Sequence, residues 1–281
     1  MHHVRGWPLP QGVLLLLAFL MAGCLAPTAT PSPFPQTTAT VPPRPAPSLR
    51  PTSTAPVPSS TPTPSPNPSP TVTPSPTPIL GLCAPLPIPP ERWRLYRSRG
   101  LTPPPTDNPD GGHQGVDFTY WEGAYGHFVS LPVQALFAGQ VAGVERGRFP
   151  YGNAVMIATR AEALSPAWQD LLGLQPREAL YTLYAHLAEP PPFAIGQAVA
   201  CGETLGHMGC SGNCGNPHLH LELRRGPAGE TFPQGWTFQS REHSEASDQA
   251  YRWWRFEGPF ALLDPWEILL QARERGLLSQ P

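Results

Sequence analysis

The stretch NPHLHLEL, residues 216–223, alternates polar and apolar side chains without a break. In a β-strand this spacing places His218, His220 and Glu222 on one face and three leucines on the other. The leucine face then packs against a core, while the histidine face presents two imidazoles at a fixed spacing. The stretch therefore predicts a strand whose polar face is either simply solvated or one half of a functional site.

Short strands between turn residues are predicted on the N-terminal side of this stretch as well. β-Branched and aromatic residues gather in segments separated by Gly, Pro and Asn. The predicted strands are 115–121, 131–145, 151–159, 180–187, 197–209 and 218–223. Apolar spacing predicts a short helical insert at 160–179 and a C-terminal helix at 264–278. We therefore expect a mainly β fold, an antiparallel β sandwich or barrel-like sheet.

Residues 1–24 have the features of an export signal. A short segment with one firm positive charge, Arg5, precedes an apolar run at 13–20 and the sequence LMAGC. The run is shorter than the roughly 20 residues that a membrane-spanning helix needs. The end of the segment resembles a bacterial lipoprotein signal, which implies lipidation of Cys24 and a membrane-anchored protein facing the cell wall. Ordinary cleavage near Cys24, giving a secreted protein, is the alternative.

Residues 25–78 consist almost entirely of Pro, Ser, Thr and Ala, with no carboxylate. Such a composition cannot bury enough apolar surface to offset chain entropy, so it predicts a disordered linker. Proline-rich repeats favour polyproline II at about 3.1 Å per residue, which gives these residues a reach of at most roughly 170 Å. The linker is typical of a tether that lets a domain work away from a membrane.

Residues 79–281 are long enough for one domain, with a core at about 111–226 and a C-terminal extension at 227–281. This part holds 15 arginines against 20 acidic residues and no basic cluster, which argues against nucleic acid as a partner. We expect a monomer.

Four cysteines follow Cys24, an even number that indicates disulfides in an exported domain. Three pairings are possible, and the tight CSGNC turn favours Cys210–Cys214 together with Cys83–Cys201. In the rival interpretation, His207, Cys210, Cys214 and His218 are spaced like the ligands of a structural zinc ion.

Two further histidine motifs accompany NPHLHLEL. HQGVDF places His113 and Asp117 four residues apart, on one face of an extended segment that follows an Asp-Gly-Gly turn. LYTLYAHL places His186 near the end of a strand, on the same face as Tyr184 and Thr182. Taken singly, each histidine is as readily explained as a solvated or core residue.

Together these residues include the side-chain types that a catalytic metal site needs. A catalytic zinc takes three ligands from His, Asp or Glu and leaves a fourth position for water. Unligated histidines nearby can transfer protons and stabilise an oxyanion. A three-histidine hydratase or oxygenase site is a weaker alternative, because a carboxylate belongs to this set.

In chain order, HQGVDF, LPVQALFAGQVAGV, YGNAVMIA, LYTLYAHL, GETLGHMGCSG and NPHLHLEL resemble the lysostaphin/LytM-type zinc metallopeptidases, over about residues 111–225. The resemblance implies one zinc ion bound by His113, Asp117 and His220, with His186 and His218 as the unligated catalytic pair. It also implies an antiparallel β fold with a groove over the metal. CSGNCGNP, the insert at 160–179 and the segment after Gly226 depart from the family pattern, and the last two are candidates to shape or cover the groove.

The resemblance further implies a zinc endopeptidase that uses a metal-activated water to hydrolyse peptide cross-links or stem peptides of bacterial peptidoglycan. The alternative is a non-catalytic wall-binding or regulatory module that activates other wall hydrolases. Members of that kind usually lack one or more of the five site residues, whereas all five are present here.

Overall fold

The computed structural model describes residues 79, 81–122, 126–238, 241 and 243–279, all within one compact unit. The signal, Cys24 and the linker lie outside the described residues. The helical elements are η1 (Pro90–Arg92), α1 (Trp93–Tyr96), η2 (Ala161–Ala163), α2 (Pro166–Leu172), α3 (Glu245–Arg252), η3 (Trp253–Glu257) and α4 (Pro265–Glu274), where η3 is π-helical. The strands are β1 (Arg97–Arg99), β2 (Val116–Phe118), β3 (Trp121–Glu122), β4 (His127–Phe128), β5 (Pro132–Gln134), β6 (Gly139–Arg148), β7 (Gly152–Arg160), β8 (Glu178–Leu187), β9 (Ala198–Val199), β10 (Thr204–His207), β11 (Leu219–Pro227) and β12 (Ala261–Leu263).

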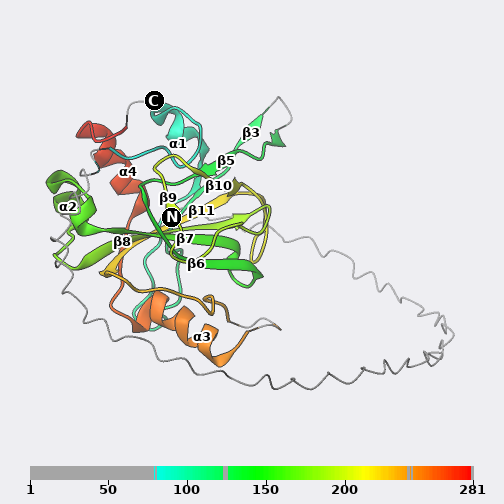
Figure 1. Cartoon of the computed structure of the whole chain (residues 1–281). Helices are drawn as coiled ribbons and strands as arrows, with labels where there is room; N and C mark the ends of the chain where they lie inside the picture. The colour runs from blue at the N-terminus through cyan, green and yellow to red at the C-terminus, as the bar shows by residue number, and fades with distance from the viewer. Residues whose placement is uncertain (1–78, 80, 123–125, 239–240, 242, 280–281) are drawn as a thin grey trace, which may run out of the picture. The chain divides into compact units, whose positions relative to one another are not determined.

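One antiparallel sheet dominates the fold (Figure 1). Its strand order is β1-β2-β11-β8-β7-β6-β9, and β12 also pairs with β11. Two small antiparallel pairs, β10-β5 and β3-β4, complete the described strands. The prediction of a mainly β, antiparallel fold is confirmed, and the second half of the alternating stretch lies in β11, an interior strand of the sheet.

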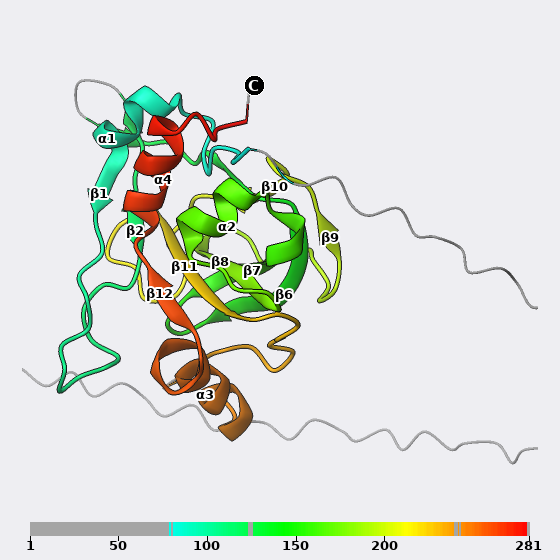
Figure 2. The same ribbon diagram turned by 90° about the vertical axis from the view of Figure 1, so that its left-hand side faces the viewer.

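The sheet buries apolar side chains on both faces. Leu219, Leu221 and Leu223 belong to one core cluster, together with side chains of α2 and α4. Figure 2 shows both helices over the same side of the sheet. The opposite face packs against a second cluster, which includes Leu183 and Trp254 and draws side chains from α3 and η3. The polar face of β11 is therefore enclosed by the protein and is not a simple solvated surface.

Caps and a glycine fix the ends of the helices. Asp264 accepts a hydrogen bond from the backbone N–H of Trp266 at the start of α4. Ser244 and Ser247 form a reciprocal capping box at the start of α3. Gly173, with φ of 63°, ends α2 in the left-handed conformation. The helical insert and the C-terminal helix thus lie within the predicted ranges, whereas α3 was not predicted.

Two disulfides join Cys83 to Cys201 and Cys210 to Cys214. The first links the segment ahead of β1 to the turn between β9 and β10. The second closes the loop between β10 and β11. Because a sulfur bound in a disulfide is not a thiolate ligand, the rival interpretation of a zinc site containing Cys210 and Cys214 is wrong.

Candidate metal centre and active site

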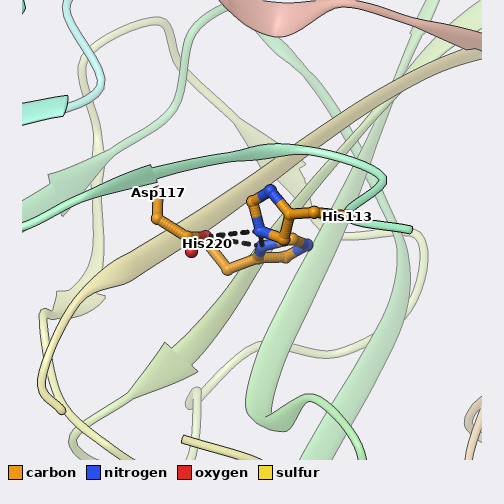
Figure 3. Close-up of side chains that lie close together, drawn as sticks. All are labelled: His113, Asp117 and His220. Carbon is orange, nitrogen blue, oxygen red and sulfur yellow. Dashed lines mark hydrogen bonds and ion pairs between the residues drawn. The ribbon is translucent and has the colours of Figure 1, made fainter. Parts of the chain in front are cut away.

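His113, Asp117 and His220 meet between β2 and β11 (Figure 3). His113 lies just before β2, and the register of the two strands places Asp117 directly opposite His220. Asp117 Oδ1 is 3.0 Å from His113 Nε2 and 2.8 Å from His220 Nδ1. The two histidine nitrogens are 3.1 Å apart. All three residues are buried, and all three line one cavity.

Gly115 makes this close approach possible. A Cβ at Gly115 would lie 2.5 Å from the backbone oxygen of Leu221 and 2.8 Å from His220 Cε1. Any larger residue would push β2 away from β11. Gly115 therefore allows the short distance between β2 and β11 that brings Asp117 to His220.

The donor set fits a single metal ion. Zinc bonds of about 2.0–2.1 Å at tetrahedral angles separate neighbouring ligand atoms by roughly 3.3 Å. The distances of 2.8–3.1 Å among the three atoms need only a slight expansion to reach that geometry. Among the described residues, no other group of His, Cys, Asp and Glu is arranged to hold a metal.

Hydrogen bonds from the far side of each imidazole set its tautomer. His113 Nδ1 donates to the backbone oxygen of Gly100 at 2.8 Å, and His220 Nε2 donates to Glu222 Oε1 at 3.1 Å. When His220 is neutral, the lone pairs on His113 Nε2 and His220 Nδ1 face Asp117, as metal ligation requires. Glu222 is fully buried, and the sequence analysis placed it on this face without giving it a role.

Buried charges hold this region in a defined ionisation state. Burial alone would raise the pKa of Asp117, but hydrogen bonds with His113 and His220 hold it far below its ordinary range. Burial alone would lower the pKa of His220, but hydrogen bonds to Asp117 and Glu222 raise it to about 9. In the metal-free protein His220 is therefore an imidazolium between two carboxylates, and a metal must displace its proton.

His186 and His218 lie next to this group, with ring centroids 4.7 Å apart. His218 Nε2 is 3.7 Å from Asp117 Oδ1. His186 Nδ1 donates to the backbone oxygen of Ser211 at 2.8 Å, and His218 Nδ1 donates to that of Asn216 at 2.6 Å. The loop closed by Cys210–Cys214 and the residues just after it thus orient both rings and leave Nε2 of each ring as a proton acceptor.

The expected position of His186 on the face of Tyr184 and Thr182 is wrong. Tyr184 and Leu187 both belong to the core cluster on the leucine face of β11, although strict alternation would place them on opposite faces. His186 has φ of 62°, a left-handed conformation that is uncommon for residues other than glycine. This irregularity turns the imidazole toward His220, whose ring centroid is 5.8 Å away. Burial lowers the pKa of His186 to about 3, and His220 and His218 add to the shift, so the ring is neutral at physiological pH.

All five residues line one cavity of about 640 Å³. The helical insert contributes nothing to its wall, whereas the C-terminal extension contributes Phe238, Tyr251 and Arg255. Ser98 and Arg99 of β1 line it as well. The extension thus shapes the cavity, and the insert does not.

A model of a known protein family, described as Peptidase family M23, matches residues 111–232. These residues belong to peptidase family M23. The matched segment contains all five cavity residues and covers the region in which the sequence motifs resemble lysostaphin/LytM-type enzymes, so that resemblance is confirmed. Comparison with curated proteins found no match.

Solved structures similar to the chain include other peptidases. The catalytic domain of lysostaphin from Staphylococcus simulans is 18% identical over 65% of this chain and 98% of its own, with a TM-score of 0.37. A zinc-containing peptidase from Vibrio cholerae is 24% identical over 46% of this chain, with a TM-score of 0.31, and the match spans only 34% of that protein. A putative glycyl-glycine endopeptidase LytM from Ruminococcus gnavus is 20% identical over 58% of this chain and 47% of its own, with a TM-score of 0.31.

The side chains that support the candidate metal ligands were not predicted from the sequence. Glu222, Tyr151 and Arg255 form one hydrogen-bonded group behind His220. Only Glu222 carried a signal, its even spacing from His220.

Within the part of the chain that the structure covers, no helix has the length and apolar character to cross a membrane.

Proposed function

We propose that the chain is a zinc-dependent endopeptidase that hydrolyses peptide cross-links or stem peptides of bacterial peptidoglycan. The observation that carries this proposal is the convergence of His113, Asp117, His220, His186 and His218 on one cavity within an M23 segment. Three of them supply the donor set of one metal, and two stay free beside it. A site reduced to a binding module would not need the free pair.

His113, Asp117 and His220 would hold the zinc ion. When bound, zinc supplies a Lewis acid that acidifies water and polarises a carbonyl group. His186 and His218 provide the proton transfers, because Nε2 of each ring is an acceptor. A ring that takes a proton from water in the cavity can return it to the leaving nitrogen of the cleaved peptide bond.

The test is digestion of purified peptidoglycan by the protein, with zinc measured in the same sample. Sacculi with glycine bridges and sacculi with direct cross-links are treated in parallel, and the muropeptides are identified by mass spectrometry with and without a chelator. Chelator-sensitive release of uncross-linked peptides supports the proposal and identifies the bond. Bound zinc without cleavage, combined with faster digestion by an added second hydrolase, would instead support a regulatory module. Absence of zinc would contradict the metal site.

We also propose that the protein is exported and anchored through a lipid on Cys24, with residues 25–78 as the tether and residues 79–281 as the catalytic domain. The lipoprotein-like sequence ending at Cys24 supports this. Incorporation of labelled palmitate that is lost in Cys24→Ala is expected. A wild-type chain that incorporates no label would contradict the anchor.

A further inference from the structure

The segment Glu245–Glu257, here called the support segment, consists of α3 and η3 and lies outside the M23 segment. It nevertheless reaches the surroundings of the proposed metal ligands. Tyr251 and Trp254 are buried, and the side chain of Arg255 is only 10% exposed. This degree of burial implies that the segment forms part of the folded site.

The support segment binds the carboxylate that orients His220. Glu222 Oε1, which accepts the hydrogen bond from His220 Nε2, also accepts one from Arg255 Nη1 at 3.0 Å. Trp254 Nε1 donates to Glu222 Oε2 at 3.2 Å. A fully buried carboxylate requires such partners, because an unpaired charge in the interior is strongly destabilising. Tyr151 and Arg224 also donate to Glu222, so the support segment supplies part of the contacts that fix its position.

The same guanidinium also binds the turn that leads to His113. Arg255 Nε donates to Asp110 Oδ1 at 3.0 Å, and Arg255 Nη2 donates to the backbone oxygen of Asp110 at 3.1 Å. Tyr251 Oη donates to Asp110 Oδ1 at 2.8 Å. Asp110 begins the Asp-Gly-Gly turn that ends at His113. Arg255 thus bridges two segments whose proposed ligands, His113 and His220, are 107 residues apart in the chain.

We propose that Arg255 is a positioning residue of the metal centre, which sets the separation of His113 and His220 through Asp110 and Glu222, with Trp254 and Tyr251 supporting it. The inference rests on the proposed metal ligands. The planar guanidinium is essential to it, because one side chain donates from three nitrogens in fixed directions to two carboxylates and a backbone oxygen. A lysine keeps the charge but cannot reproduce these directions.

The test compares Arg255→Lys with Arg252→Lys, both of which preserve charge. Arg252 lies three residues earlier in the same segment, but its side chain is 39% exposed and pairs with Asp248 and Glu257, away from the cavity. Zinc affinity is measured by competition with a chelating dye, at a temperature at which circular dichroism shows each variant to be folded. Loss of an outer partner of a metal ligand typically weakens affinity about 10–100-fold. Arg255 contacts these outer partners and not the ligands, so we expect about a tenfold loss in Arg255→Lys, the lower end of that range, and none in Arg252→Lys.

Cobalt substitution adds a readout that a purely stabilising role would not change. The visible absorption of bound cobalt reports its coordination geometry, so it should differ between Arg255→Lys and the wild type and be unchanged in Arg252→Lys. Arg255→Lys that binds zinc within threefold of the wild type, with the same cobalt spectrum, would overturn the inference. His220→Ala is measured alongside. If His220→Ala retains full zinc affinity, the proposed ligands themselves are wrong, which is a separate failure.

Discussion

The two halves of the cavity are held in place by different means. On one half, His113, Asp117 and His220 contact each other and are supported by buried charged side chains, chiefly Glu222 and its arginines. On the other half, His186 and His218 donate to backbone oxygens of the loop ahead of β11, and a disulfide closes that loop. Ionised side chains dominate the first half, and neutral backbone dominates the second.

This difference follows from the charge that each half has to carry. A metal ion brings two positive charges, which nearby carboxylates stabilise and which require deprotonated ligands. A proton acceptor has to stay neutral until it reacts, and a carboxylate partner would raise its pKa. Backbone oxygens orient an imidazole without adding a charge. The pKa values agree with this difference: that of His220 is raised to about 9, and that of His186 is lowered to about 3.

The largest loss of function is expected from His220→Ala, which affects the half of the cavity that holds the proposed metal ligands. This change removes one of three ligands and leaves Glu222 without its imidazole partner. Zinc binding and peptidoglycan hydrolysis should both fall below detection, as measured by metal analysis after gel filtration and by release of soluble muropeptides. His207→Ala is the matched control, because the His207 side chain is 51% exposed. Hydrolysis that survives in His220→Ala would refute the ligand half.

Replacement of either unligated histidine should separate catalysis from metal binding. His186→Ala and His218→Ala each remove a proton acceptor, for which the expected loss of kcat is roughly 10²–10⁴-fold. Both variants should retain one zinc per chain, because neither ring belongs to the donor set. Zinc content and kcat on an isolated cross-linked muropeptide check this. A variant that loses zinc along with activity would show that its histidine also supports metal binding, which contradicts the division into two halves.

The pH dependence of zinc affinity should report the ligand half. The pKa of His220 in the metal-free protein is about 9, above its ordinary value, so zinc has to displace a proton at any lower pH. Affinity should therefore rise about tenfold per pH unit from pH 7 and level off near pH 9.

The same shift stabilises the metal-free fold below pH 6.5, and this contribution disappears as pH rises through 9. Calorimetric titration with zinc at pH 7 in two buffers of different ionisation enthalpy should show release of one proton. An affinity that does not change between pH 7 and 9 would contradict the assigned state of His220.

Removal of the two disulfides should affect different properties: catalysis for Cys210–Cys214 and stability for Cys83–Cys201. Cys210→Ser with Cys214→Ser loosens the loop that orients both free imidazoles. A misplacement of 1 Å can lower the rate about a hundredfold, and a loosened loop should misplace the rings by less. We therefore expect kcat to fall about tenfold, with zinc affinity unchanged.

Cys83→Ser with Cys201→Ser opens a crosslink between residues 118 positions apart, so the free energy of unfolding should fall by about 5 kcal/mol. Below its melting temperature this second variant should keep the wild-type kcat. Denaturant unfolding and kcat, measured on both variants, check the pair. Equal losses of kcat would show that the loop disulfide is only a general stabiliser.

The central strand and the site residues on it were predictable because their information is local. Unbroken alternation in 216–223 defines both faces of β11, and the structure brings together all five residues chosen from the sequence. His186 was predicted as one of the unligated catalytic pair, but on the wrong face of its strand, because nothing in LYTLYAHL indicates a left-handed residue. Alternation assumes regular dihedrals, and this strand departs from them at the site itself.

The support of the ligands was not predictable because it is non-local. Arg255 and Glu222 are 33 residues apart, and no periodicity connects them. The same holds for Gly100, whose backbone oxygen binds His113 from the segment after β1. Backbone acceptors of this kind leave no trace in composition. Such partners become visible only when the sheet has brought distant segments side by side.

The Cys83–Cys201 disulfide also has a mechanical consequence. Force applied to the chain ahead of Cys83 would, without the crosslink, strip residues one at a time toward Gly100 and His113. With the crosslink, only residues before Cys83 can be pulled away, because the tension passes through the sulfur atoms into the turn between β9 and β10. The segment that carries β1 and leads to the first proposed ligand is therefore shielded from a pull on the N-terminal side. A domain built this way can bear tension without disturbing the segment that leads to His113.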